Sequence, residues 1–312
     1  MNFIPLPGEF GDRARALLAG ELTPVPARDA ATVVLLRDVC QSAEDAGVTG
    51  AGRAHGDRAG ERDAGSAGRG TGSAGRGVEV YLIRRKASMA FAAGAYVFPG
   101  GSVDPRDGDH DVAWAGPEPG WWAEALGADV VTARGLVCAA VRETFEESGV
   151  LLAGPSAGTV VADTSGDDWE ADRVDLIGRR LSMAAFLARR GLVLRADLLR
   201  PWGHWITPEV EFKRFDTRFF VAALPPGQVT RDVGGEADQV EWLRPARAIE
   251  RAKAGEINLM PPTYRTLSEM AGYDNVSAVL GSDRKVETFQ PHAAEVDGEM
   301  RLILPGHDYL AP

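Results

Sequence analysis

The chain has 312 residues, of which 45% are hydrophobic and 25% are charged. This balance is typical of a globular protein with a buried core, and it excludes bulk disorder. The formal net charge of −11 disfavours general binding to nucleic acids, so a phosphate-bearing ligand must meet a local cation or a metal ion.

The two cysteines, Cys40 and Cys138, lie far apart in the sequence and in dissimilar surroundings. This placement argues against a disulfide framework or a zinc site, and it fits a reducing compartment. The first ten residues lack a basic segment and a long apolar run, and no later run approaches the length of a membrane span. We therefore expect a cytoplasmic protein with no membrane partner.

Two short apolar runs rich in β-branched residues, 31–37 and 78–84, predict two strands that lie close together. The segment between them, 41–77, consists almost entirely of Gly, Ala, Ser, Arg, Asp and Glu, and contains the hexapeptide GSAGRG twice. Such a segment cannot bury enough apolar surface to offset the entropy lost on ordering, so we predict a disordered insertion. An RNA-binding Arg/Gly segment is the alternative, which the lack of aromatic residues and the interspersed acids disfavour.

The rest of the chain mixes helix and strand patterns without a regular β–α–β repeat. Apolar residues at helical spacing predict a helix over 133–148, which Gly149 should end in a left-handed conformation. Further patterns predict strands at 150–152, 212–224, 239–243 and 301–304, and helices at 173–190, 245–255 and 262–271. We expect one α+β domain over 1–312, carrying the disordered insertion 41–77 and a mainly helical insertion at 153–205.

Three acidic residues of the predicted helix, Glu143, Glu146 and Glu147, are spaced to lie on one side of it. Like charges within roughly 5 to 6 Å of each other repel unless a cation neutralises them. Clustered carboxylate oxygens suit hard divalent ions such as Mg²⁺ or Mn²⁺. A solvated acidic helix face is the alternative interpretation of the same spacing.

The sequence around these carboxylates, RETFEESGV at 142–150, resembles the second half of the Nudix box, REUxEExGU, in which U is a bulky apolar residue. Thr144 stands where an apolar residue is usual. The opening glycine of the box resembles Gly101 in the sequence FPGG, and a long insertion separates it from the helix. The internal glutamate of the box, expected eight positions before the arginine, is replaced by Arg134. The resemblance implies a Nudix α/β/α sandwich with a mixed sheet.

The resemblance also implies roles for individual residues. Glu143 and Glu147 would bind Mg²⁺ or Mn²⁺, and Glu146 and the carbonyl of Gly101 would complete the site. Arg142 would clamp a glutamate of the cluster through its guanidinium group. In some family members a distal loop glutamate acts as the base or as an extra metal ligand, and Glu236 is the candidate here. An ordinary loop acid is the alternative interpretation of Glu236.

Longer segments resemble one branch of the superfamily, the peroxisomal-type coenzyme A diphosphatases and their bacterial relatives. These segments include GAYVFPGGSVD, WITPEVEFKRFDTRFFVAAL and INLMPPTYRTL, and they extend over most of 31–273. The branch implies hydrolysis of coenzyme A or acyl-coenzyme A to 3′,5′-ADP and a phosphopantetheine product. Its coenzyme A signature is incomplete here, with Ala90 where an arginine is expected. A pyrophosphatase for ADP-ribose, dinucleotides or other nucleoside diphosphate derivatives, and a non-catalytic Nudix-fold sensor, are the alternatives.

Two groups of basic residues could meet the phosphates of a small-molecule nucleotide substrate. Arg84 and Lys86 end one predicted strand, and Lys213 and Arg214 begin another. Solvation at the surface is the alternative role for each of them. The sequence leaves a monomer and a homodimer open.

Overall fold

In the computed structural model of the chain, residues 3–39, 77–86, 92–231 and 237–305 are described. The predicted disordered insertion at 41–77 lies outside them except for Gly77, and so does Glu236. Within these ranges, no helix is long and apolar enough to cross a membrane.

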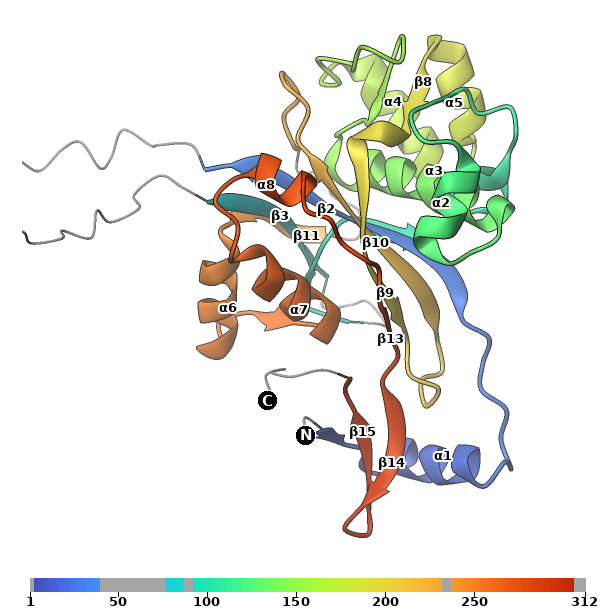
Figure 1. Cartoon of the computed structure of the whole chain (residues 1–312), viewed down its shortest axis with the longest axis vertical. Coiled ribbons are helices and arrows are strands. Elements are labelled where there is room, and N and C mark those ends of the chain that lie inside the picture. The colour runs from blue at the N-terminus through green and yellow to red at the C-terminus, as the bar shows by residue number, and fades with distance from the viewer. Residues whose placement is uncertain (1–2, 40–76, 87–91, 232–236, 306–312) are drawn as a thin grey trace, which may run out of the picture.

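A mixed sheet of nine strands forms the centre of the molecule (Figure 1). Its longest strand, β2 (Arg28–Asp38), runs antiparallel to β3 (Val78–Arg85) and parallel to β10 (Phe215–Ala223). The pairing of Leu36 with Val80 confirms that the strands predicted at 31–37 and 78–84 are neighbours. The other strands are β4 (Ala95–Val97), β5 (Gly100–Ser102), β9 (Leu199–Ile206), β11 (Ala237–Leu243), β12 (Asn258–Leu259) and β13 (Thr288–Phe289).

Helices cover both faces of this sheet (Figure 1). On one face lie α2 (Pro119–Leu126), α3 (Val130–Ser148), α4 (Asp167–Ile177) and α5 (Met183–Arg190). On the other lie α6 (Pro245–Lys253), α7 (Pro261–Met270) and α8 (Val276–Leu280). The strand period of two divides β2 between the two cores, with Val33 and Leu35 facing α3 and Val34 and Leu36 facing the opposite helices. The predicted α+β sandwich with a mixed sheet is confirmed.

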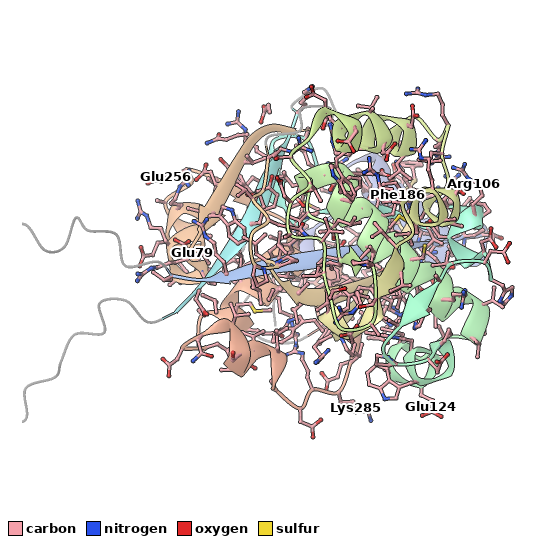
Figure 2. All side chains as sticks on the ribbon, turned by 90° about the horizontal axis from the view of Figure 1, so that it is seen from above. Glu79, Arg106, Glu124, Phe186, Glu256 and Lys285 are labelled. Atoms are coloured by element: carbon pink, nitrogen blue, oxygen red, sulfur yellow. The ribbon has the colours of Figure 1, made fainter. Side chains whose placement is uncertain are left out.

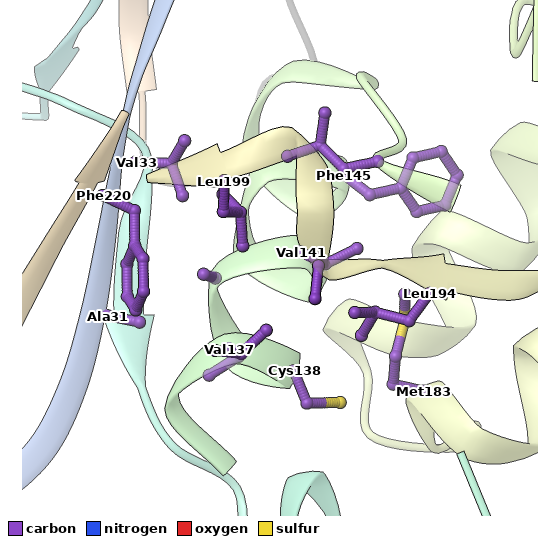
Figure 3. Packing of buried hydrophobic residues seen from close by; sticks show 14 of the residues in the cluster. Ala31, Val33, Val137, Cys138, Val141, Phe145, Met183, Leu194, Leu199 and Phe220 are labelled. Carbon is purple, nitrogen blue, oxygen red and sulfur yellow. The ribbon is translucent and has the colours of Figure 1, made fainter. Parts of the chain in front are cut away.

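The helix α3 begins three residues earlier than the sequence pattern predicts. Asp129 caps it, because its side chain accepts hydrogen bonds from the backbone N–H groups of Val131 and Thr132, each 2.9 Å long. Gly149 ends the helix with a φ of 73°, as predicted. Phe145 and its neighbours pack between the sheet and the outer helices, as Figure 3 shows. This packing fixes the face of α3 that carries the acidic residues.

Two predictions in the segment after α3 are wrong. Residues 150–152 form no strand, and the short strand β7 (Ala153–Gly154) follows them instead. The single helix predicted at 173–190 is two helices, α4 and α5, because Gly178 ends the first and the Ser182 side chain caps the second by accepting from Ala185 N. The strand β9, which overlaps the end of the predicted insertion 153–205, belongs to the central sheet.

The inserted segments before and after α3 are joined to each other. The strand β6 (Trp114–Ala115) runs parallel to β8 (Val193–Arg195), and β7 pairs with the other edge of β8. A further small sheet joins the two ends of the described chain: β1 (Phe3–Pro5), β14 (His292–Val296) and β15 (Glu299–Ile303), beside α1 (Glu9–Leu18). Figure 1 shows this sheet below the central one.

Figure 2 contrasts several charged side chains at the surface with one aromatic side chain in the core. In Figure 2, Arg106, Glu124 and Glu256 project outwards, whereas Phe186 of α5 lies between the helices. Phe186 stacks on Phe145 with ring centroids 5.3 Å apart. The inserted helices therefore pack directly on α3.

Candidate metal centre

The acidic side of α3 faces the first residues of β5. A carboxylate oxygen of Glu147 accepts a hydrogen bond of 2.8 Å from the backbone N–H of Gly100. A Cβ atom at Gly101 would lie 2.5 Å from Oε1 of Glu143, so a larger residue at this position would displace the Glu143 carboxylate. The structure thus brings the opening glycine of the sequence pattern against the glutamates of α3, although about forty residues separate them in the chain.

Arg142 holds several oxygen atoms of this cluster together. Its Nη1 donates to Oε1 of Glu143 at 2.7 Å and to Oε1 of Glu146 at 3.2 Å. Its Nη2 donates to Oδ2 of Asp107 at 2.9 Å and to the carbonyl of Ser102 at 3.0 Å. The Arg142 side chain is 11% exposed and that of Asp107 only 2%. One buried guanidinium group therefore contacts three carboxylates, and its single positive charge offsets only part of their combined negative charge.

Asp107 is a residue of this site that the sequence analysis missed. It lies in a 3-10 turn, η2 (Pro105–Gly108), within the segment that separates Gly101 from α3. Arg134, at the position where the family pattern has its glutamate, instead donates to the backbone carbonyls of Asp109, His110 and Val112. Counting back eight positions from Arg142 stays within α3 and so reaches Arg134, because the inserted segment lies before this helix. Counting forward from Gly101 reaches Asp107 after six positions.

Burial and mutual repulsion favour the protonated forms of these carboxylates. Burial raises the pKa of Glu143 to about 7; Arg142 opposes this shift and Glu146 adds to it. Burial likewise raises the pKa of Glu146, against the effect of Arg142. A cluster that binds protons near neutral pH also favours other cations.

The atoms of the cluster that could bind a metal ion are all oxygen atoms, and oxygen ligands suit Mg²⁺ or Mn²⁺. In the present side-chain conformations, the described residues contain no group of three His, Cys, Asp or Glu side chains placed to hold a metal ion. Arg142 contacts one carboxylate oxygen of Glu143 and one of Glu146 in this arrangement. The residue types and their common location fit a divalent ion, and side-chain rotation of the glutamates would be required to bind it.

The basic residues predicted to meet substrate phosphates have other partners in the structure. Arg84 pairs with Asp238, with Nε and Oδ1 2.6 Å apart. Because side chains alternate along a strand, Arg84 lies on the same face of β3 as Leu82, which is the face away from α3. Lys86 comes just after β3 and is half-buried.

The second pair of basic residues lies before β10. Arg214 is buried and donates to the carbonyls of Thr207 and Val25. The Nζ of Lys213 lies 5.2 Å from the centroid of the Phe215 ring. The contacts of Arg214 indicate a structural role, and phosphate binding by these four residues stays a prediction.

Comparisons with known proteins agree with this geometry. A family model described as the NUDT19 Nudix domain matches residues 122–270. An acyl-coenzyme A diphosphatase NUDT19 from Xenopus laevis is 25% identical over 274 residues, covering 74% of this chain and 70% of the relative. The protein of that name from Gallus gallus is 28% identical over 251 residues, covering 67% of this chain and 66% of the relative.

A solved structure shows the same similarity in three dimensions. The crystal structure of a Nudix hydrolase from Alicyclobacillus acidocaldarius matches with a TM-score of 0.62 and 26% sequence identity. The match covers 84% of this chain and 98% of that one. The similarity therefore includes the central sheet and its helices rather than α3 alone.

Proposed function

Because this chain belongs to the Nudix hydrolase superfamily and is similar to its acyl-coenzyme A diphosphatase branch, we propose that it hydrolyses the diphosphate linkage of coenzyme A or acyl-coenzyme A. One P–O bond of the linkage breaks and one water molecule adds across it. The products are 3′,5′-ADP and phosphopantetheine or its acyl derivative. The observation that supports this proposal best is the carboxylate cluster of α3 against Gly100 and Gly101 of β5.

Individual residues of the site would have separate roles in this reaction. Glu143, Glu146 and Glu147, with the carbonyl of Gly101, would hold Mg²⁺ or Mn²⁺, which when bound neutralises the negative charge of the diphosphate. Arg142 keeps the carboxylates of Glu143 and Glu146 near each other despite their repulsion. A carboxylate would accept the proton of the attacking water. Glu236 remains a candidate for this base and lies outside the described residues.

The substrate can be identified with one set of incubations. Purified protein with Mg²⁺, with Mn²⁺ or with chelator would be incubated with coenzyme A, an acyl-coenzyme A, ADP-ribose and NADH. We expect divalent-metal-dependent release of 3′,5′-ADP, identified by chromatography and mass, from the two coenzyme A substrates. If ADP-ribose or NADH is hydrolysed much faster, the coenzyme A assignment is wrong and the alternative pyrophosphatase activity is correct. If no substrate is turned over, the result favours the non-catalytic sensor.

A pair of glutamate variants tests the site itself. Glu147→Gln should lower turnover by at least about a hundredfold, since it removes a charged ligand of the proposed metal. Glu124→Gln, an exposed residue of α2, should leave turnover unchanged. Equal turnover in the two variants would contradict the proposed mechanism.

A further inference from the structure

The C-terminal end of α3 contacts an arginine of the inserted helix α4. Nη1 of Arg173 donates to the backbone carbonyl of Glu146 at 2.7 Å, and Arg173 is only 3% exposed. Glu146 is within the last four residues of α3, whose carbonyls have no partner within the helix. Arg173 therefore satisfies a carbonyl of a proposed metal-binding residue from outside the helix.

Glu170 links Arg173 to a second arginine. Its carboxylate oxygens lie 2.6 and 2.9 Å from nitrogen atoms of Arg173, and one of them lies 3.4 Å from Nη2 of Arg231. The backbone N–H of Arg231 donates to the carbonyl of Ser148 at 2.9 Å. We call Glu170, Arg173 and Arg231 the helix-end clamp, since they join α4 and the segment after β10 to the last turn of α3.

The charge of the clamp suits its position. The C-terminal end of a helix carries a partial negative charge, so carboxylates in its last two turns are disfavoured and cations there are favoured. Glu143, Glu146 and Glu147 all lie in these turns. Arg142 contacts the carboxylates of Glu143 and Glu146, whereas Arg173 contacts the backbone between Glu146 and Glu147.

The attachment of α4 to α3 does not depend on the clamp alone. Phe145 of α3 packs against Trp169 of α4, with centroids 6.4 Å apart, and against Phe186 of α5. These aromatic contacts hold the inserted helices in place by burying apolar area. Removal of the clamp should therefore leave the inserted helices attached and should affect chiefly the last turn of α3.

We propose that Arg173 is a positioning residue of the metal site, through which the inserted helix α4 fixes the orientation of Glu146 and Glu147. Outer residues that orient metal ligands commonly change metal affinity by about 10- to 100-fold when they are replaced. This inference assigns a functional part to the insertion, and it rests on the metal site of the proposed function.

The experiment compares two arginine variants with matched surroundings. Arg173→Met keeps the apolar part of the side chain and removes the donor to Glu146. Arg195→Met is the control, since Arg195 also lies in the inserted segment, pairs with Asp197 through two 2.7 Å contacts, and donates to a backbone carbonyl, that of Thr159. Their side chains are similarly buried, 4% exposed for Arg173 and 9% for Arg195.

Binding of Mn²⁺ alone would be measured by electron paramagnetic resonance titration, with no substrate present. We expect Arg173→Met to weaken Mn²⁺ binding by about tenfold and Arg195→Met by less than about twofold. Hydrogen exchange of the metal-free protein should show faster exchange over 145–149 in Arg173→Met only. Loss of kcat should exceed any change in KM for Arg173→Met, because the substrate-binding surface is unchanged.

The outcomes separate the inference from the proposed function. If the wild-type protein binds no Mn²⁺, the proposed metal site fails. If it binds Mn²⁺ and Arg173→Met binds it equally well, or if Arg195→Met loses as much affinity, only the positioning role is refuted. If Arg173→Met does not fold, Glu170→Gln is used instead. This substitution weakens the ion pair that holds Arg173, and the Glu170 side chain is 41% exposed. We expect about threefold weaker Mn²⁺ binding for Glu170→Gln, and unchanged binding would refute the positioning role.

Discussion

The carboxylate of Asp107 lies 2.9 Å from the guanidinium group of Arg142, although 35 positions separate the two residues in the sequence. Asp107 is almost completely buried, and Arg142 provides the ion pair that compensates its charge. The same guanidinium group contacts Glu143 and Glu146. The turn that contains Asp107 thereby fixes the position of Arg142, and the arrangement of the acidic cluster depends on Arg142.

Asp107→Asn should destabilise the protein and weaken the metal site together. Because Arg142 keeps its two glutamate partners, we expect a loss of about 2 kcal/mol in the free energy of unfolding, below the 3–5 kcal/mol typical of a fully broken buried pair. Urea unfolding in the presence of chelator measures this loss. Asp12→Asn is the control, since the Asp12 side chain is 80% exposed in its pair with Arg15 and should contribute about 0–1 kcal/mol. Equal effects of the two substitutions would show that Asp107 is not a structural anchor.

The raised pKa of Glu143 predicts a specific pH dependence of stability in the metal-free protein. In the unfolded chain this carboxyl ionises near 4.5, whereas in the folded protein it keeps its proton up to about pH 7. The folded state thus binds this proton more tightly, so the contribution of Glu143 to stability is fully present below pH 4.5 and is lost as the pH rises through 7. The loss should be about 2 to 3 kcal/mol across this window. The free energy of unfolding would be measured for wild type and Glu143→Gln at pH 5.0 and 7.5. The difference between the two proteins isolates the effect of Glu143, because the variant lacks the titrating group.

Metal binding should show the opposite pH dependence. A divalent ion competes with the proton on Glu143, so Mn²⁺ affinity should rise by up to about tenfold per pH unit below pH 7 and level off above it. Titrations at several pH values measure this slope. A pH-independent Mn²⁺ affinity between pH 5.5 and 7 would show that Glu143 does not bind the ion or does not hold the proton.

The sequence predicted the parts of the fold in which a local pattern coincides with the final contacts. The apolar, β-branched run at 31–37 predicted β2, because both faces of that strand are buried, and the helical spacing in 133–148 predicted α3, because its apolar side packs in the core. Thr144 departs from the family pattern and is nevertheless fully buried, since its hydroxyl donates to the carbonyl of Ala140 at 2.7 Å. Such a bond inside one helix turn is not visible as an apolar pattern.

What the sequence did not predict depends on contacts between distant segments. The pairing of Asp107 with Arg142 arises only when the turn at 105–108 packs on α3. The break between α4 and α5 was missed because apolar residues continue on both sides of Gly178. The partners of Arg214 are two backbone carbonyls, one of them 189 positions away, which no spacing rule reveals.

The contrast between Arg214 and Lys213 gives a test of their roles. Arg214→Met should destabilise the protein by about 2 kcal/mol, since Arg214 is buried and the substitution removes its hydrogen bonds to the carbonyls of Thr207 and Val25. Lys213→Met, at an exposed position, should change stability by about 0.5 kcal/mol or less. If either residue binds substrate phosphates as the sequence suggested, KM would rise at least about fivefold without a matching loss of stability. Thermal unfolding together with steady-state kinetics separates the two roles.

The last prediction concerns the segment between β2 and β3. Val39 and Gly77 are joined by a backbone hydrogen bond of 3.2 Å, and Asp38 pairs with Val78, so the two ends of residues 40–76 meet at the end of a β-hairpin. A four-residue turn can therefore replace that segment without moving either strand. The replacement shortens the loop by roughly three doublings of length, and each doubling costs about 0.6 kcal/mol in closure entropy. We expect the free energy of unfolding to rise by about 1 to 2 kcal/mol and turnover to stay within about twofold of the full chain. Chemical unfolding and steady-state assays of the shortened protein measure both quantities, and a loss of stability or of turnover would show that residues 40–76 contribute to the packing or the active site.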